Sequence, residues 1–388
     1  MAGADNVVRD LIIKILEENK TKPKNLEIKP ISTEGANYTT SLYKLKVNTE
    51  DENLDLFAKV AIISEEMRKQ MNADSFYKTE SFVYLNLVEI FEAIQDKYNV
   101  PEEHRFIFPK CYGISQEPGQ ETVVLEDLMA KGYKSYSRFD SMDWEHAAVS
   151  VEVLAKFHAL SFAYNQENPT EFKELIASME YKLSNEHENN EQMLLVWTNM
   201  VDRALSAIDD EHKDKIRDLM MQKEYLDKYN KPTEKPVLCH GDYRLSNILY
   251  RQEGETLRGI AVDYQIVYSG CPSADLVYFI FMGSDEEFRG KHFDRLVDHY
   301  YDHLCQALRR LDLDHVEVYP RETFDEHMKE SLQYALFLGI GMLPVVTVEA
   351  EAAPKMDSDI STFIVETNAL YASRLQGIVN DCVRWGLI

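Results

Sequence analysis

The chain has 388 residues, of which 45% are hydrophobic and 28% charged, and its formal net charge at pH 7 is −25. This length and composition predict a globular protein of two lobes or domains and exclude a largely disordered chain. The negative charge argues against nucleic acid and anionic membranes as partners, because both would be repelled.

The first predicted element is an amphipathic helix over residues 5–19, whose apolar side chains recur at helical spacing. The pattern then changes to β, with alternation around residues 43–47, a polar turn, and a return strand over residues 54–61. The loop before these strands contains one glycine. In it the hydroxyls of Thr39 and Thr40, together with backbone N–H groups, could contact phosphate.

Lys59 lies inside the apolar return strand, where an unpaired ammonium group would be costly to bury. Strand alternation would equally permit a Lys59 that faces solvent on the outer side of the sheet. The helical pattern over residues 73–95 supplies a partner, since Glu80 lies in a largely aromatic segment where a carboxylate needs a cation. We therefore predict a Lys59–Glu80 ion pair.

Two further strands are predicted at residues 106–111 and 121–125, and Glu126-Asp127-Leu128 follows them. From Asp143 the chain is mostly helical, and His158 on the first apolar stripe is interpreted as a buried core histidine. The expected fold class is α+β, with a small β-rich lobe over residues 1–127 and a larger helical lobe over residues 128–388.

The most informative stretch is residues 237–265. An apolar strand leads into the loop His240-Gly241-Asp242-Tyr243-Arg244-Leu245-Ser246-Asn247, and two apolar strands follow around a glycine-containing turn. A hairpin returns its second strand beside its first, so we expect Asp263 to lie near Asn247.

Phosphoryl transfer needs this set of polar groups. Asp242 would orient and deprotonate a hydroxyl, while Asn247 and Asp263 would hold Mg²⁺. Each residue alone could be an ordinary turn or strand-end residue, but their order and spacing favour a site. Only a short segment separates Asp263 from Asp275, so the peptide-docking activation segment of protein kinases does not fit and a small-molecule acceptor is favoured. Asp275 could also be the N-cap of the helix that follows it.

The pattern His240-Gly241-Asp242-x4-Asn247 followed by Asp263 resembles the aminoglycoside phosphotransferase and choline kinase superfamily. Asp263-Tyr264-Gln265 and the downstream Cys271-Pro272-Ser273-Ala274-Asp275-Leu276 resemble the ecdysteroid kinase-like group of insects within it. The spacing Phe76-x3-Glu80-x3-Tyr84 is similar to the same group. The resemblance implies a two-lobed, protein-kinase-like fold.

The resemblance also implies roles for individual residues. Lys59 would contact the α- and β-phosphates of ATP, Glu80 would position Lys59, and the backbone from Glu126 to Leu128 would contact adenine. Asp275 would steady the catalytic loop through His240 or its backbone, which makes both residues structural supports.

The implied activity is ATP- and Mg²⁺-dependent phosphorylation of a hydroxyl on a small, apolar molecule, with the C-22 hydroxyl of an ecdysteroid as the first expectation and an inactive conjugate as the product. A detoxifying kinase for foreign hydroxylated compounds is the alternative, and a choline- or aminoglycoside-type kinase stays open. A non-catalytic pseudokinase would lack at least one of the chemical residues, and all five are present: Lys59, Glu80, Asp242, Asn247 and Asp263.

Five scattered cysteines without a C-x-x-C pair predict reduced thiols in a cytoplasmic protein. The first residues do not have the basic and apolar pattern of a secretory signal. The longest apolar run, residues 335–348, contains two glycines and a proline and is too short to span a bilayer. We therefore expect no membrane association and no obligate protein partner.

Overall fold

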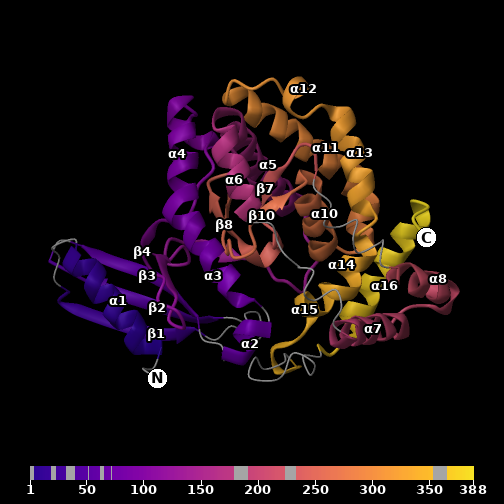
Figure 1. The fold of residues 1–388 in the computed structure, drawn as a ribbon, viewed down its shortest axis with the longest axis horizontal. Helices are drawn as coiled ribbons and strands as arrows, with labels where there is room; N and C mark the ends of the chain where they lie inside the picture. The colour runs from indigo at the N-terminus through magenta and orange to yellow at the C-terminus, as the bar shows by residue number, and fades with distance from the viewer. Residues whose placement is uncertain are drawn as a thin grey trace. The chain divides into compact units, whose positions relative to one another are not determined.

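The computed structural model describes residues 4–18, 23–31, 40–50, 52–61, 65–70, 72–178, 191–222, 233–352 and 365–388. The chain forms two compact units. Unit 1 comprises Met1–Val88, Ile107–Lys134 and Glu349–Ile364, and unit 2 comprises Glu89–Phe106, Ser135–Val348 and Val365–Ile388. Unit 1 is rich in strands and unit 2 is mostly helical, so the expected α+β class is confirmed (Figure 1). The lobe boundary between residues 127 and 128 stays a prediction.

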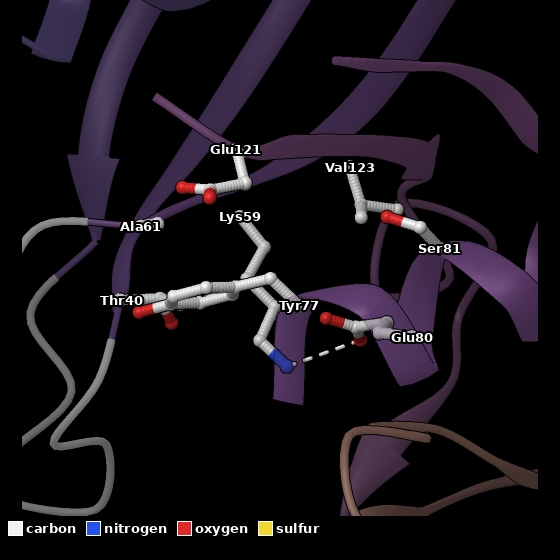
Figure 2. A pocket seen from close by; sticks show the side chains of 8 residues that line it. All are labelled: Thr40, Lys59, Ala61, Tyr77, Glu80, Ser81, Glu121 and Val123. Carbon is white, nitrogen blue, oxygen red and sulfur yellow. Dashed lines mark hydrogen bonds and ion pairs between the residues drawn. The ribbon is translucent and has the colours of Figure 1, made fainter. Parts of the chain in front are cut away.

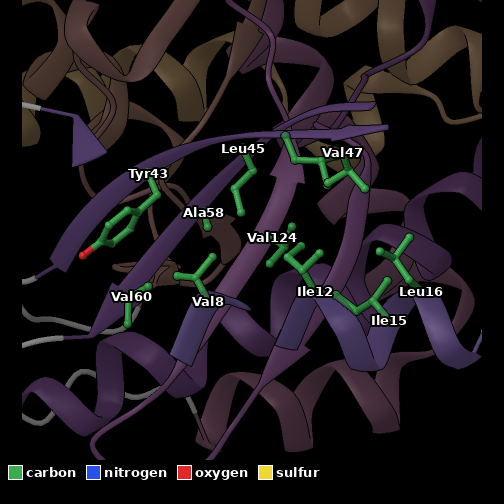
Figure 3. Packing of buried hydrophobic residues seen from close by; sticks show 11 residues of the cluster. Val8, Ile12, Ile15, Leu16, Tyr43, Leu45, Val47, Ala58, Val60 and Val124 are labelled. Carbon is green, nitrogen blue, oxygen red and sulfur yellow. The ribbon is translucent and has the colours of Figure 1, made fainter. Parts of the chain in front are cut away.

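Unit 1 is built on a five-stranded antiparallel sheet with the strand order β1-β2-β3-β5-β4. Its strands are β1 (Asn25–Ile31), β2 (Thr40–Asn48), β3 (Asn53–Ala61), β4 (Cys111–Ser115) and β5 (Thr122–Glu126). The second half of β2 alternates between buried and exposed residues, as expected for a sheet with one face on the core. Helix α1 (Ala4–Glu18) covers that face, and Val8, Ile12 and Leu16 pack against strand residues such as Leu45 and Val124 (Figure 3).

The strand expected at residues 106–111 is wrong for most of its length, since β4 begins only at Cys111. Residues 106–110 contain buried Phe106 and Phe108 but form no strand. The backbone N–H of Phe106 donates to Gln95 Oε1 at 2.6 Å, and its carbonyl accepts from Gln95 Nε2 at 3.2 Å. A side chain thus satisfies the backbone groups that a sheet partner would otherwise have bonded.

The helical pattern over residues 73–95 is confirmed. Helix α3 (Ala73–Phe82) runs through a π-helical turn, η1 (Val83–Leu87), into α4 (Val88–Lys97), and the short α2 (Glu65–Gln70) precedes them. Side chains three or four residues apart lie on one face of a helix. Tyr77 and Glu80 of α3 are accordingly both buried.

Unit 2 is organised around two long helices, α5 (Trp144–Glu167) and α11 (Glu286–Arg310), which pack along each other (Figure 1). Asp143 caps α5, since its Oδ1 accepts from the backbone N–H of His146 at 2.9 Å. The other helices are α6 (Pro169–Ser178), α7 (Glu191–Ser206), α8 (Lys213–Met220), α10 (Pro272–Gly283), α12 (His315–Val318), α13 (Arg321–Leu332), α14 (Ala335–Gly341), α15 (Leu343–Thr347) and α16 (Ala369–Arg384).

The remaining strands are short and lie among these helices. They are β6 (Lys134–Ser135), β7 (Val237–Cys239), β8 (Ile248–Glu253), β9 (Thr256–Ala261) and β10 (Tyr268–Gly270). Strand β7 pairs with β10, and β8 pairs with β9 in a hairpin that turns at Gly254. In the described parts of the chain, no helix is long and apolar enough to cross a membrane.

Candidate active site

Unit 1 contains the predicted ion pair. Lys59 on β3 and Glu80 on α3 are joined by a 3.1 Å contact between Nζ and Oε1, and their side chains are only 8% and 4% exposed (Figure 2). The ion pair is therefore confirmed, and the alternative of a solvent-facing lysine is wrong. Alternation could not decide this point, because the last four residues of β3 are all buried. A cation buried to this degree requires its carboxylate partner.

A small hollow that opens to solvent lies at this pair, and both side chains line it. Thr40 lines it, because β2 begins there and Thr40 lies opposite Ala61 in the register of β2 and β3 (Figure 2). Thr39, the other expected phosphate contact, lies outside the described residues.

Tyr77 is a lining residue that the sequence reasoning missed. Its ring lies beside the Lys59 side chain in Figure 2, and burial raises its pKa above the usual range. Its spacing of three residues from Glu80 was the available signal, since it places both side chains on one helix face. Glu121 also lines the hollow and forms an ion pair with Arg68 of α2, so a second cation lies at its edge.

The segment expected to contact adenine has one backbone donor available. The N–H of Glu126 donates to Lys110 O at 2.9 Å, and the N–H of Asp127 donates to Asp55 O at 3.0 Å. Leu128 O accepts from residues 131 and 133, but within the described ranges the Leu128 N–H has no acceptor. Of the two expected contact residues, Glu126 already uses its N–H within the protein, whereas the N–H of Leu128 could donate to a ligand.

Unit 2 contains the predicted set of Asp242, Asn247 and Asp263. Asp242 follows β7 and is held by three donors. Tyr278 Oη donates to Asp242 Oδ1 at 2.6 Å, Arg244 Nε lies 3.0 and 3.1 Å from the two carboxylate oxygens, and Asn247 Nδ2 donates to Oδ2 at 2.9 Å. Asn247 Nδ2 also donates to the backbone oxygen of Asp242 at 2.9 Å. These contacts fix the orientation of a carboxylate that is only 15% exposed.

The hairpin brings Asp263 back to Asn247, as expected. Ile248 lies opposite Ala261 in the register of β8 and β9, and the N–H of Val262 donates to Asn247 O at 2.9 Å. Asp263 then adopts a left-handed backbone conformation with φ of 69°, which is uncommon outside glycine and tolerated best by Asn and Asp. The hairpin pattern in the sequence was the feature that predicted the closeness of Asp263 and Asn247.

The donor atoms at this place suit a hard divalent cation. Asn247 uses its amide nitrogen on Asp242, and within the described chain its Oδ1 accepts no hydrogen bond. The amide oxygen of Asn247 and the carboxylate of Asp263 are the types of oxygen ligand that Mg²⁺ prefers. Burial alone would lower the pKa of Arg244, but the charge of Asp242 first, then those of Tyr278 and Asp263, outweigh it, so the pKa is raised and Arg244 stays cationic.

Asp275 holds the backbone of the loop over residues 240–247. Its Oδ2 accepts from the N–H of His240 at 2.6 Å, and its Oδ1 accepts from the N–H of Gly241 at 3.0 Å, which is the contact that the resemblance implied. The N-cap alternative is wrong, since α10 begins at Pro272 and its N-cap is Cys271, without a side-chain cap. Gly241 has φ of 82°, and a Cβ there would lie 2.1 Å from Ile266 O, so this position requires glycine.

Two buried histidines complete the support. His158 on α5 is fully buried, as expected, and its ring nitrogens lie 2.6 Å from Tyr300 Oη and 3.2 Å from Asp275 Oδ2. The sequence did not reveal that contact with Asp275. His240 Nε2 lies 3.1 Å from Val262 O, which ties the loop to the hairpin. The positions of both rings suit support rather than chemistry.

Comparison with known proteins gives a family match. The model of the ecdysteroid kinase-like family matches residues 34–313, which is more than half of the chain. No curated protein matches the sequence.

Similar solved structures include an ethanolamine kinase of Plasmodium vivax (13% identity, TM-score 0.40, covering 94% of this chain and 83% of that one). They also include a spectinomycin phosphotransferase in complex with ADP and spectinomycin (12%, 0.39, 95% and 98%) and a microcompartment-associated aminopropanol kinase (9%, 0.41, 96% and 95%). TM-scores near 0.4 support no statement about substrate. On the family match, the chain belongs to the ecdysteroid kinase-like family.

Proposed function

We propose that this protein is an ATP- and Mg²⁺-dependent kinase that phosphorylates a hydroxyl of a small molecule. The observation that carries the proposal is the group in unit 2: Asp242 is held by three donors, and Asn247 and Asp263 are brought together by the β8–β9 hairpin. A fixed carboxylate beside an amide oxygen and a second carboxylate is the set that phosphoryl transfer to a hydroxyl needs. Membership of the family supports the same reaction.

Each residue then has a role. Asp242 orients the acceptor hydroxyl and takes its proton, while Asn247 and Asp263 hold Mg²⁺, which neutralises charge on the transferring phosphoryl group. On the nucleotide side, Lys59 contacts the α- and β-phosphates and Glu80 holds Lys59 in place. The hydroxyls of Thr39 and Thr40 contact phosphate, and the Leu128 N–H contacts adenine. His240 and Asp275 support the loop.

We infer that the acceptor is a hydroxylated, largely apolar molecule, with the C-22 hydroxyl of an ecdysteroid as the first candidate. The family match supports this choice over choline or an aminoglycoside. A foreign hydroxylated compound is the second candidate, because a pocket for an apolar acceptor would also admit it. The reaction would proceed in the cytoplasm, and it requires neither nucleic acid nor a membrane.

The experiment is an acceptor screen with the purified full chain, ATP and Mg²⁺. The acceptors are ecdysone, 20-hydroxyecdysone, choline and plant phenolic glycosides, and the product is detected as the mass gain of one phosphoryl group. Turnover of another acceptor with no phosphorylated ecdysteroid would overturn the substrate and leave the reaction class intact. No turnover of any acceptor, together with no hydrolysis of ATP, would count against the reaction class.

The mechanism is tested with Asp242→Asn. This variant keeps the size of the side chain but cannot take a proton, so we expect turnover to fall about a hundredfold or more. Asp218→Asn is the matched control, because Asp218 is an exposed aspartate on α8 outside the site. Full turnover in Asp242→Asn would contradict the assignment of the base.

A further inference from the structure

A second cluster of ligand-type side chains, which shares no residue with the phosphotransfer group of Asp242, Asn247 and Asp263, lies where α5 packs along α11. Glu152 projects from α5, and His299 and His303 project from α11. The two histidines are four residues apart, so they lie on the same face of α11, and their ring centroids are 4.3 Å apart. We propose that Glu152, His299 and His303 bind a divalent transition metal ion of the Zn²⁺ type.

The distances suit such an ion. Glu152 Oε1 lies 2.9 Å from His299 Nε2 and 3.6 Å from His303 Nε2, and the three donor atoms all lie within 4.8 Å of one another. Ligands bound tetrahedrally at about 2.0–2.1 Å are separated by about 3.3 Å. The two contacts of Glu152 bracket that separation, so small side-chain movements would complete the site.

The exposure of the cluster also suits a bound ion. The three side chains are between 27% and 32% exposed, which allows an ion to enter from solvent and a water to take a fourth position. Two helices would supply the ligands, so binding would connect α5 to α11. Two histidines and one carboxylate with an open position form a ligand set that zinc adopts in proteins.

Lys156 is the main group that opposes a cation, since it lies one helical turn after Glu152 on α5. Its side chain is partly buried. A positively charged neighbour weakens the binding of ions that are held mainly by charge, such as Mg²⁺ and Ca²⁺. Imidazole nitrogens favour Zn²⁺, Cu²⁺ and Ni²⁺ instead. The two imidazole ligands of the cluster therefore favour a transition metal ion over Mg²⁺ or Ca²⁺.

The test uses the full chain freed of metal by a chelator, with Mg²⁺ in excess to occupy the phosphotransfer site, and Zn²⁺ titrated by calorimetry. We expect one Zn²⁺ site whose affinity falls at least tenfold in Glu152→Gln and in His303→Gln. His292→Gln is the matched control. His292 also lies on α11, and its ring lies beside Trp144, as the ring of His299 does, but it is outside the cluster. Lys156→Gln should strengthen binding.

Two further measurements distinguish binding at this site from binding at other residues that could hold a metal ion. Asp263→Asn should leave Zn²⁺ binding unchanged, because Asp263 belongs to the phosphotransfer group. Trp144 has its ring centroid 5.8 Å from that of His299, so titrated Cu²⁺ should quench its fluorescence, and Trp144→Phe should remove that signal. Circular dichroism of each variant checks that it is folded.

The proposal is overturned if wild-type protein binds no Zn²⁺ under these conditions, or if folded Glu152→Gln and His303→Gln both keep full affinity. Loss of binding in Asp263→Asn would also overturn it, because it would place the ion at the phosphotransfer residues. The proposal does not depend on the kinase assignment, so an inactive acceptor screen leaves this test unaffected.

Discussion

The buried pair of Lys59 and Glu80 can be tested for stability and for function separately. At 3.1 Å, two unit charges attract by about 5 kcal/mol at an effective dielectric constant of about 20, and desolvation offsets much of this. Glu80→Gln leaves the buried ammonium without its counter-charge, which should cost about 3–5 kcal/mol of stability. The double variant Lys59→Met with Glu80→Leu removes both charges and should recover most of that loss.

Urea unfolding followed by circular dichroism measures these differences. Tryptophan fluorescence is unsuitable, because Trp144, Trp197 and Trp385 all lie in unit 2. If Lys59 contacts the nucleotide, the double variant will be stable but will bind ADP at least tenfold more weakly and lose turnover. A double variant that keeps wild-type affinity and turnover would refute the nucleotide role. An unchanged urea midpoint in Glu80→Gln would refute the energetic reasoning.

Two further predictions concern unit 2. Tyr278→Phe removes a hydrogen bond to the Asp242 carboxylate. Because hydrogen bonds to charged groups are worth about 1.5–3 kcal/mol, kcat should fall about tenfold or more while KM for ATP stays constant. An unchanged kcat would contradict the positioning role of Tyr278. Asp143→Ala should lower stability by about 1 kcal/mol at pH 7, whereas Asp143→Asn should not, since asparagine also caps a helix. Burial raises the pKa of Asp143, but hydrogen bonds from His146 outweigh it and lower the pKa. The advantage of wild type over Asp143→Ala is therefore complete above pH 3.8 and shrinks as the pH falls through the lowered pKa, as urea midpoints across that range will show.

Local sequence patterns predicted the elements whose physics is local. The alternation in β2 and the turn at Gly254 specify a strand and a hairpin from neighbouring residues alone, and both are present. Residues 106–110, which are mostly apolar, gave the same signal as a strand but form none. Gln95 of α4 satisfies the Phe106 backbone there, and no local pattern reveals a partner that comes from a separate element.

The candidate site divides in the same way. The hairpin placed Asp263 near Asn247 because the chain itself connects them, and the cost of a buried ammonium predicted a partner for Lys59. Tyr278 and His158 were missed as residues that support the loop over residues 240–247. Each lies on an apolar helix where a tyrosine or histidine is an ordinary core residue, and only the packing of α10 and α5 against the loop gives them their contacts.

Helix α10 determines the geometry of the loop over residues 240–247 in two ways. Asp275 near its N-terminus bonds the backbone N–H groups of His240 and Gly241, and Tyr278, one turn later, bonds the side chain of Asp242. Most residues of α10 are buried, so the helix has little freedom to shift. One rigid element therefore fixes both the path of the loop and the direction of its carboxylate. In the proposed reaction, a carboxylate held in this way would lose little orientational freedom when the acceptor hydroxyl binds, which is the condition under which positioning contributes most to the rate.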